Sequence, residues 1–113
     1  MEEHSVLLID KPAGITSFGV VARVRRRLSQ QLGKKAKVGH TGTLDPFATG
    51  LMIIVTGKEC RNAQQYSKLD KVYEATVRLG QTSTTGDPEG DLTDVSTREP
   101  SLEEVQHALK GFI

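Results

Sequence analysis

The sequence predicts an α+β fold, in which a mixed sheet is flanked by helices, and three observations support this prediction. Two short apolar runs, at residues 6–9 and 51–56, are typical of buried strands. Between them, apolar residues recur every three to four positions from 18 to 32, as on one face of a helix. Residues 71–79 alternate between apolar and polar, as in a half-buried strand. With 113 residues, the chain fits one small domain that buries roughly two thirds of its unfolded surface.

The first third of the chain is predicted to form a strand, a turn and a basic helix. The run at 6–9 is a buried strand in this prediction, and it ends in a turn at 10–14. Ser17 is predicted to cap the helix at 18–32, and Gly33 to end it. The apolar face of this helix comprises Phe18, Val21, Val24 or Arg25, Leu28 and Leu32.

The middle of the chain is predicted to hold a glycine-rich loop between regular elements. Residues 39–50 cannot be helical, because they contain three glycines and a proline. The strand at 51–56 is predicted to be buried on both faces, and a short polar helix follows at about 59–67. In the strand at 71–79, the alternation points Tyr73 inward with the core.

The last third is predicted to be a polar loop and a helix. The loop spans 80–100 and contains a weak strand near 92–95. Residues 101–104 read Ser-Leu-Glu-Glu, a capping box that opens a helix. Its inner face is predicted to comprise Leu102, Val105 and Leu109.

Several classes of protein and of site are not supported by the sequence. The longest uncharged apolar run, 51–55, is far short of the roughly 20 residues that a bilayer requires, so a cytoplasmic protein without membrane contact is expected. Cys60 is alone, which excludes a disulfide framework and a cysteine zinc site. The histidines lack metal-binding spacing, and neither 57–59 nor 87–91 completes a phosphate-binding or calcium-binding motif. We therefore expect no metal and no nucleotide cofactor.

The charges are unevenly distributed although the net charge is only +1. Residues 11–44 contain no acid, whereas acids dominate from Asp87 to Glu104. Such asymmetry indicates one side that faces a polyanion and one that is solvated. On composition alone, a merely solvated helix face is an equal alternative. The bases of the first segment are Lys11, Arg23, Arg25, Arg26, Arg27, Lys34, Lys35 and Lys37.

The stretch GHTGTLDPFATG, residues 39–50, holds a single acid, Asp45. A residue before proline is kept extended, and Gly42 and Gly50 permit tight turns on both sides. The loop is therefore predicted to present the Asp45 carboxylate to solvent, next in sequence to the basic helix. The alternatives are that Asp45 only caps a turn or pairs with a neighbouring arginine.

At this stretch the sequence resembles the TruB family of pseudouridine synthases. The resemblance rests on residues 39–50 together with three further segments in the same order and spacing. These are LIDKPAGITS at 8–17, KVYEA at 71–75 and LGQTSTTGD at 79–87. Similarity over about ninety residues implies a pseudouridine synthase-like catalytic domain with a mainly antiparallel sheet.

The resemblance implies an enzyme that converts a uridine in RNA to pseudouridine without cofactor or metal. It implies that Asp45 is the catalytic aspartate, that His40 contacts the displaced nucleotide, and that Tyr73 packs on the target base. Thr41 and Gly42 would lie against the substrate. Lys11 and Pro12 would support the active-site loop structurally. The expected contacts to the RNA backbone come from Arg23, Arg26, Arg27, Lys34, Lys35 and Lys37.

Within the family, Thr41 and Ala48 resemble the bacterial type that modifies the T-loop uridine of tRNA, so the tRNA T-arm is the expected partner. A guide-RNA-dependent relative and a non-catalytic RNA-binding or tRNA-folding module are the alternatives. The later family motifs, with a further tyrosine, an arginine that pairs with the aspartate and a leucine, cannot be located here. Residues 1–113 are thus expected to be the amino-terminal part of the catalytic domain, binding RNA weakly and catalysing poorly alone.

Overall fold

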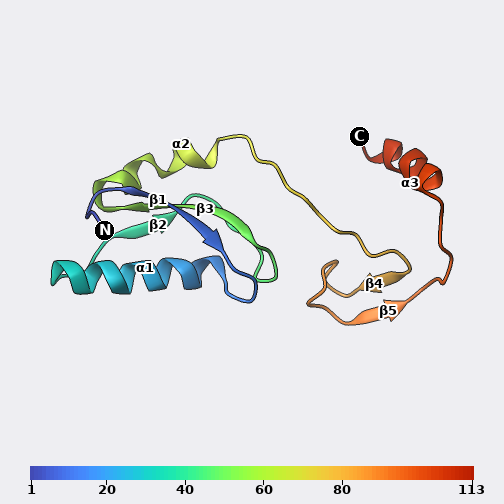
Figure 1. The fold of residues 1–113 in the computed structure, drawn as a ribbon, viewed down its shortest axis with the longest axis horizontal. Helices are drawn as coiled ribbons and strands as arrows, with labels where there is room; N and C mark the ends of the chain where they lie inside the picture. Colours follow the sequence, from blue (N-terminus) through green and yellow to red (C-terminus); the bar gives the residue numbers. More distant parts are fainter. The chain divides into compact units, whose positions relative to one another are not determined.

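The computed structural model describes all residues from 1 to 113, and it divides the chain into two compact units, Met1–Val72 and Tyr73–Ile113 (Figure 1). Each unit has its own antiparallel sheet and at least one helix. Every strand pair is antiparallel, so the α+β class is confirmed, whereas the prediction of a mixed sheet is wrong for this chain.

The first unit is built on a sheet of three strands in the order β1-β3-β2. They are β1 (Val6–Lys11), β2 (Val38–His40) and β3 (Gly50–Thr56). The predicted strand β3 takes the centre, where its apolar residues are covered on both sides, although Leu51 at its start is 62% exposed. Strand β2 was not predicted, because three residues carry too little periodicity; it forms by pairing with the free edge of β3.

Strand β1 corrects one expectation. It was predicted to be buried, but its first five residues alternate between exposed and half-buried, and Leu8 is 68% exposed. The reason is its place at the edge of the sheet, where only one face meets the core. A four-residue apolar run cannot reveal that place from sequence.

Helix α1 (Ser17–Leu32) confirms the predicted helix and revises how it begins. Its N-cap is Thr16, whose side chain accepts the Gly19 N–H at 2.9 Å, and not Ser17. Gly33 ends the helix with φ +69°, as predicted. Val21 and Leu28 of the predicted apolar face are buried, as is Val20, whereas Phe18, which was placed on that face, is 65% exposed.

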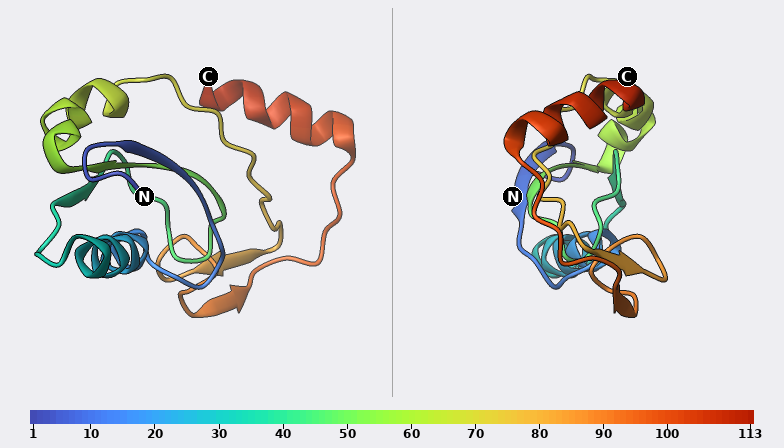
Figure 2. Two further views of the ribbon diagram at one scale, coloured as in Figure 1. Left: turned by 60° about the vertical axis from the view of Figure 1, so that its left-hand side comes forward. Right: turned by 90° about the vertical axis from the view of Figure 1, so that its right-hand side faces the viewer.

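The core of the first unit lies between α1 and the sheet. Short helices, η1 (Gly57–Asn62) and α2 (Ala63–Ser67), lie on the opposite side of the sheet (Figures 1 and 2). They account for the helix predicted at 59–67. The buried apolar residues of the core are Val20, Val21, Leu28, Ala36, Val38, Met52 and Ile54.

The segment predicted as a strand at 71–79 is not a strand. Its residues are in no regular element and all are exposed. Tyr73, expected to point inward, is 69% exposed. Alternation shows only that a strand could bury one face; forming it requires a neighbouring strand to take up the backbone hydrogen bonds, and this chain offers none there.

The second unit contains a hairpin and a helix. Strand β4 (Gln81–Ser83) pairs with β5 (Leu92–Asp94), which confirms the weak strand predicted near 92–95. Helix α3 (Leu102–Leu109) begins with the predicted capping box, and η2 (Lys110–Phe112) follows it. The predicted inner face is wrong, because no residue of α3 is buried and Leu102 is 72% exposed.

None of the helices has both the length and the apolar character that crossing a membrane would require.

Candidate active site

Asp45 lies in the connection between β2 and β3, which we name the Asp45 loop (residues 41–49). This loop has no regular secondary structure, and its backbone is held by polar contacts to residues from other parts of the first unit. Those contacts fall on the residues immediately before and after Asp45 and at the start of the loop. They decide where the carboxylate is presented.

The anchor before Asp45 is Ser17, at the first turn of α1. Its hydroxyl accepts the Leu44 N–H and donates to the Leu44 C=O, both at 2.9 Å. Ser17 is 3% exposed, and Leu44 packs against the hydrophobic core. Sequence reasoning had assigned Ser17 to capping the helix. Because Thr16 performs that capping, the Ser17 hydroxyl is available to the loop.

The anchor after Asp45 is Lys11, at the end of β1. The C=O of Pro46 accepts the Gly14 N–H at 2.7 Å and the Lys11 ammonium at 3.1 Å. Lys11 is fully buried, and it also donates to the C=O groups of Pro12 and Ile15, each at 2.8 Å. All three ammonium hydrogens therefore have acceptors. These contacts support the structural role expected of Lys11 and Pro12.

Asp45 itself is exposed between these two anchored neighbours. Its C=O accepts the Ala48 N–H at 3.0 Å, which closes a turn with Pro46 at the second position. Its carboxylate makes no hydrogen bond and no ion pair in the chain. No arginine of this chain pairs with it, so the side chain is free to meet a ligand while its backbone is fixed.

The other loop residues singled out from sequence differ in their availability. His40 is exposed at the end of β2, with Nδ1 3.1 Å from the Gly42 C=O. Thr41 is 8% exposed, and its N–H and hydroxyl both donate to the Ile53 C=O, at 3.2 and 3.1 Å. Its own C=O accepts the Ser67 hydroxyl at 2.6 Å. Thr41 therefore anchors the loop, whereas His40 and Gly42 face solvent.

Four of the predicted substrate-contacting or catalytic residues lie in the first unit, at the end of β2 and in the Asp45 loop: His40, Thr41, Gly42 and Asp45. Tyr73 is the first residue of the second unit, with its side chain exposed. No group of three or more His, Cys, Asp or Glu side chains is arranged to hold a metal ion.

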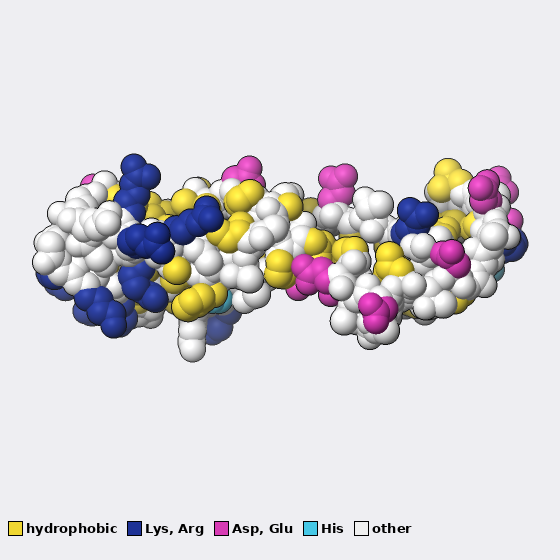
Figure 3. Space-filling view, turned by 90° about the horizontal axis from the view of Figure 1, so that it is seen from below, with side chains coloured by type: hydrophobic (Ala, Val, Ile, Leu, Met, Phe, Trp, Pro, Cys, Tyr) yellow, Lys and Arg dark blue, Asp and Glu magenta, His cyan; other side chains and the backbone are white.

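The basic residues gather on the first unit, where Figure 3 shows Lys and Arg side chains over α1. The acids are divided between the units, with six on the first and eight on the second. Arg23, Arg26 and Arg27 are exposed on α1 and have no acidic partner. Lys34 pairs with Glu3 at 3.0 Å, and this hydrogen bond lowers the pKa of the Glu3 carboxyl. Arg25 is half-buried and donates to the Val38 C=O at 3.3 Å.

Comparison with known proteins gives consistent relatives. The chain is 46% identical over 112 residues to the tRNA pseudouridine synthase B of Cupriavidus taiwanensis, covering 99% of this chain and 34% of that protein. It is 42% identical to the protein of that name from Opitutus terrae, covering 99% of this chain and 45% of that protein. It is 48% identical to the tRNA pseudouridine synthase B of Thermobifida fusca, covering 91% of this chain and 33% of that protein. The chain thus spans from a third to less than half of these relatives' length.

A family model described as TruB family pseudouridylate synthase (N terminal domain) matches residues 25–113, which include the Asp45 loop, residues 25–72 of the first unit and the whole second unit. The match covers more than half of the chain, and the relatives extend the similarity to Lys11 and Ser17. The chain therefore belongs to the TruB family of pseudouridylate synthases.

Proposed function

We propose that residues 1–113 are the amino-terminal part of the catalytic domain of a tRNA pseudouridine synthase, with a pseudouridine synthase-like fold when complete, and that Asp45 is its catalytic residue. The observation that carries this proposal is the exposed Asp45 carboxylate, which has no partner although the backbone on both sides of it is anchored. The fixed backbone holds the reactive group in position, and the unpaired carboxylate is accessible to a substrate. The names of the relatives support the reaction type.

The reaction is an isomerisation, so the proposal needs no oxidant or reductant. The N1–C1′ bond of uridine breaks, a C5–C1′ bond forms, and the proton lost from C5 is replaced by one gained at N1. A carboxylate is suited to nucleophilic or acid/base work in such a step. The base must first leave its stack, which costs a few kcal/mol. His40, exposed beside the loop, would contact the displaced nucleotide.

Tyr73 would stack on the extruded base, because aromatic side chains serve as platforms for single bases. Its exposed ring is compatible with this role, since a tyrosine packed in a core would have no free face. The proposed substrate is the T-loop uridine of tRNA. The names of the relatives, tRNA pseudouridine synthase B, favour tRNA as the substrate over guide-RNA-dependent modification. The cytoplasmic location stays a prediction.

The test is single-turnover conversion of uridine to pseudouridine in a T-loop stem-loop RNA. The 113-residue chain is assayed beside a chain that includes its natural downstream sequence. Asp45→Asn in the longer chain is expected to abolish conversion while RNA binding persists. Asp70→Asn is the matched control, because it removes the charge of another exposed acid of the first unit.

Unchanged conversion by Asp45→Asn would remove Asp45 from the mechanism. Retained RNA binding without conversion by either unmodified chain would instead favour the second candidate function, a non-catalytic RNA-binding module. The observation that favours this alternative is the group of unpaired arginines on α1.

A further inference from the structure

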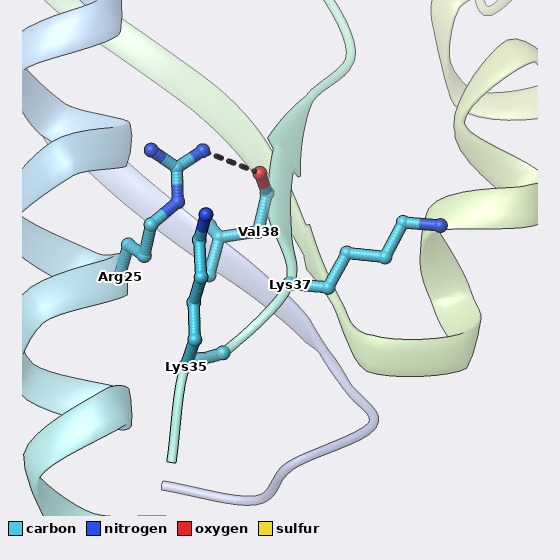
Figure 4. Close-up of a pocket in the computed structure, with 5 residues that line it drawn as sticks. Arg25, Lys35, Lys37 and Val38 are labelled. Atoms are coloured by element: carbon cyan, nitrogen blue, oxygen red, sulfur yellow. Dashed lines mark hydrogen bonds between the residues drawn. The ribbon is translucent and has the colours of Figure 1, made fainter.

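A shallow pocket of about 350 Å³ lies between α1 and β2, and Asp45 is not among the residues that line it. Its lining contains three basic residues and no acid: Arg25, Lys35, Ala36, Lys37 and Val38. Figure 4 shows that the guanidinium of Arg25 and the ammonium of Lys35 lie on the same side of β2, whereas the Lys37 side chain extends to the other side. The cationic end of the pocket is therefore formed by Arg25 and Lys35.

Arg25 is oriented by the fold. It is half-buried, and one of its N–H groups donates to the Val38 C=O at 3.3 Å, which directs the guanidinium along the edge strand β2. A guanidinium has five N–H donors in a planar fork, so most of them remain free for a second partner. That fork matches the oxygens of a phosphate group.

Lys35 adds a second positive charge that has no carboxylate partner. The ion pairs of the first unit involve Glu3, which is shared by Lys34 and His4, and none reaches Lys35 or Arg25. The whole segment from 11 to 44 contains no acid. Two cations turned to the same side repel each other, and a bound anion relieves that repulsion. The pocket is thus electrostatically suited to an anion.

We propose that Arg25 and Lys35 bind a phosphate of the RNA backbone. The identity of the ligand as RNA rests on the proposed function, whereas its anionic chemistry rests on the pocket. Val38 lies two residues before His40 on β2, which is about 7 Å along a strand. An RNA whose uridine reaches the Asp45 loop would therefore pass its backbone close to the pocket. This assignment distinguishes Arg25 from the exposed Arg23, Arg26 and Arg27, which have no such pocket.

The test measures binding of the 113-residue chain to oligoadenylate at a series of salt concentrations. This RNA has phosphates but no uridine, so the result does not depend on isomerisation. Each phosphate contact contributes about 0.7 to the slope of log affinity against log salt on a single strand. Arg25→Gln and Lys35→Gln are each expected to reduce the slope by about 0.7, and the double variant by about 1.4.

The matched control is Arg61→Gln, which removes the same charge from an exposed position of η1, on the opposite side of the sheet from α1. It is expected to leave the slope unchanged. Lys35 is exposed, so Lys35→Gln should fold normally and keeps the test decisive if Arg25→Gln is destabilised. An equal slope change in Arg61→Gln, no change in Lys35→Gln, or no binding by the unmodified chain would overturn the proposal.

Inorganic phosphate at constant ionic strength distinguishes a free anion from an RNA backbone. Competition by phosphate together with the expected slope changes supports the proposal; phosphate binding without them would mean a free-anion site and overturn it. Failure of conversion by the longer chain, with the slope changes intact, would count against the isomerase proposal and leave the phosphate contact standing.

Discussion

At the scale of single residues, the site depends on buried polar groups that position an exposed acid. Ser17 and Lys11 are nearly or fully buried, and both bond to the backbone of the Asp45 loop. A buried polar group is costly unless it is hydrogen-bonded, so each of these side chains specifies the loop conformation that satisfies it. The loop is thereby ordered without helix or strand.

Ser17→Ala is expected to lower the free energy of unfolding by about 1–3 kcal/mol, because it leaves the N–H and C=O of Leu44 without their partner. The change should also accelerate hydrogen exchange at the Leu44 amide. Urea denaturation and native-state exchange measure the two effects.

Ser29→Ala is the control for this variant, since Ser29 bonds the Ala36 N–H and does not touch the Asp45 loop. Protection of the Leu44 amide should be unaffected in it. If Leu44 exchanges equally in Ser17→Ala and in the unmodified chain, Ser17 does not position the loop.

At the scale of elements, sequence patterns correctly predicted those features whose hydrogen-bond partners lie within the same element. The stop at Gly33 and the capping box at Ser101 were both predicted and are both present. The strand at 71–79 was not formed, because its partners would have to come from elsewhere in the fold. The same reason explains why β2 and β4 were missed.

Helix α3 is expected to fray in acid. The hydrogen bond from Arg98, followed by that from the Ser101 N–H, lowers the pKa of the Glu104 carboxyl. A lowered folded-state pKa means that the stabilisation is present above the ordinary value of about 4.3 and is lost as the pH falls through the lowered value. Circular dichroism and the Ser101 amide shift should report this transition.

Glu104→Gln should abolish the transition, because a glutamine can keep the capping box but does not titrate in this range. Glu103→Gln, in the same turn of the helix, should leave it in place. A transition that persists in Glu104→Gln would show that another group controls the end of α3.

At the scale of the whole molecule, the chain is organised as two units joined near Val72. The hydrophobic core and the Asp45 loop belong to the first unit, whereas α3 in the second unit has no buried residue. Chain length and composition favoured a single domain. They give the number of apolar residues but do not show which of these residues pack together in one core.

Limited digestion with trypsin is expected to cut first after Lys71 or Arg78, where the backbone is exposed and outside regular structure. The fragment that begins at Met1 should keep the circular dichroism of the first unit. Mass spectrometry of the early products identifies the sites. First cuts at Arg25 or Arg26, within α1, would show that the first unit opens more readily than the junction.

The sequence by itself determined the α+β class, α1 with its glycine stop, the central strand β3 and the motif around Asp45, because helix periodicity, caps and apolar runs are local properties of the chain. Only the tertiary structure decided that Ser17 serves the loop, that β1 is an edge strand and that Arg25 shares a pocket with Lys35. These features depend on contacts between residues distant in sequence, and such contacts exist only once the sheet and α1 have packed together.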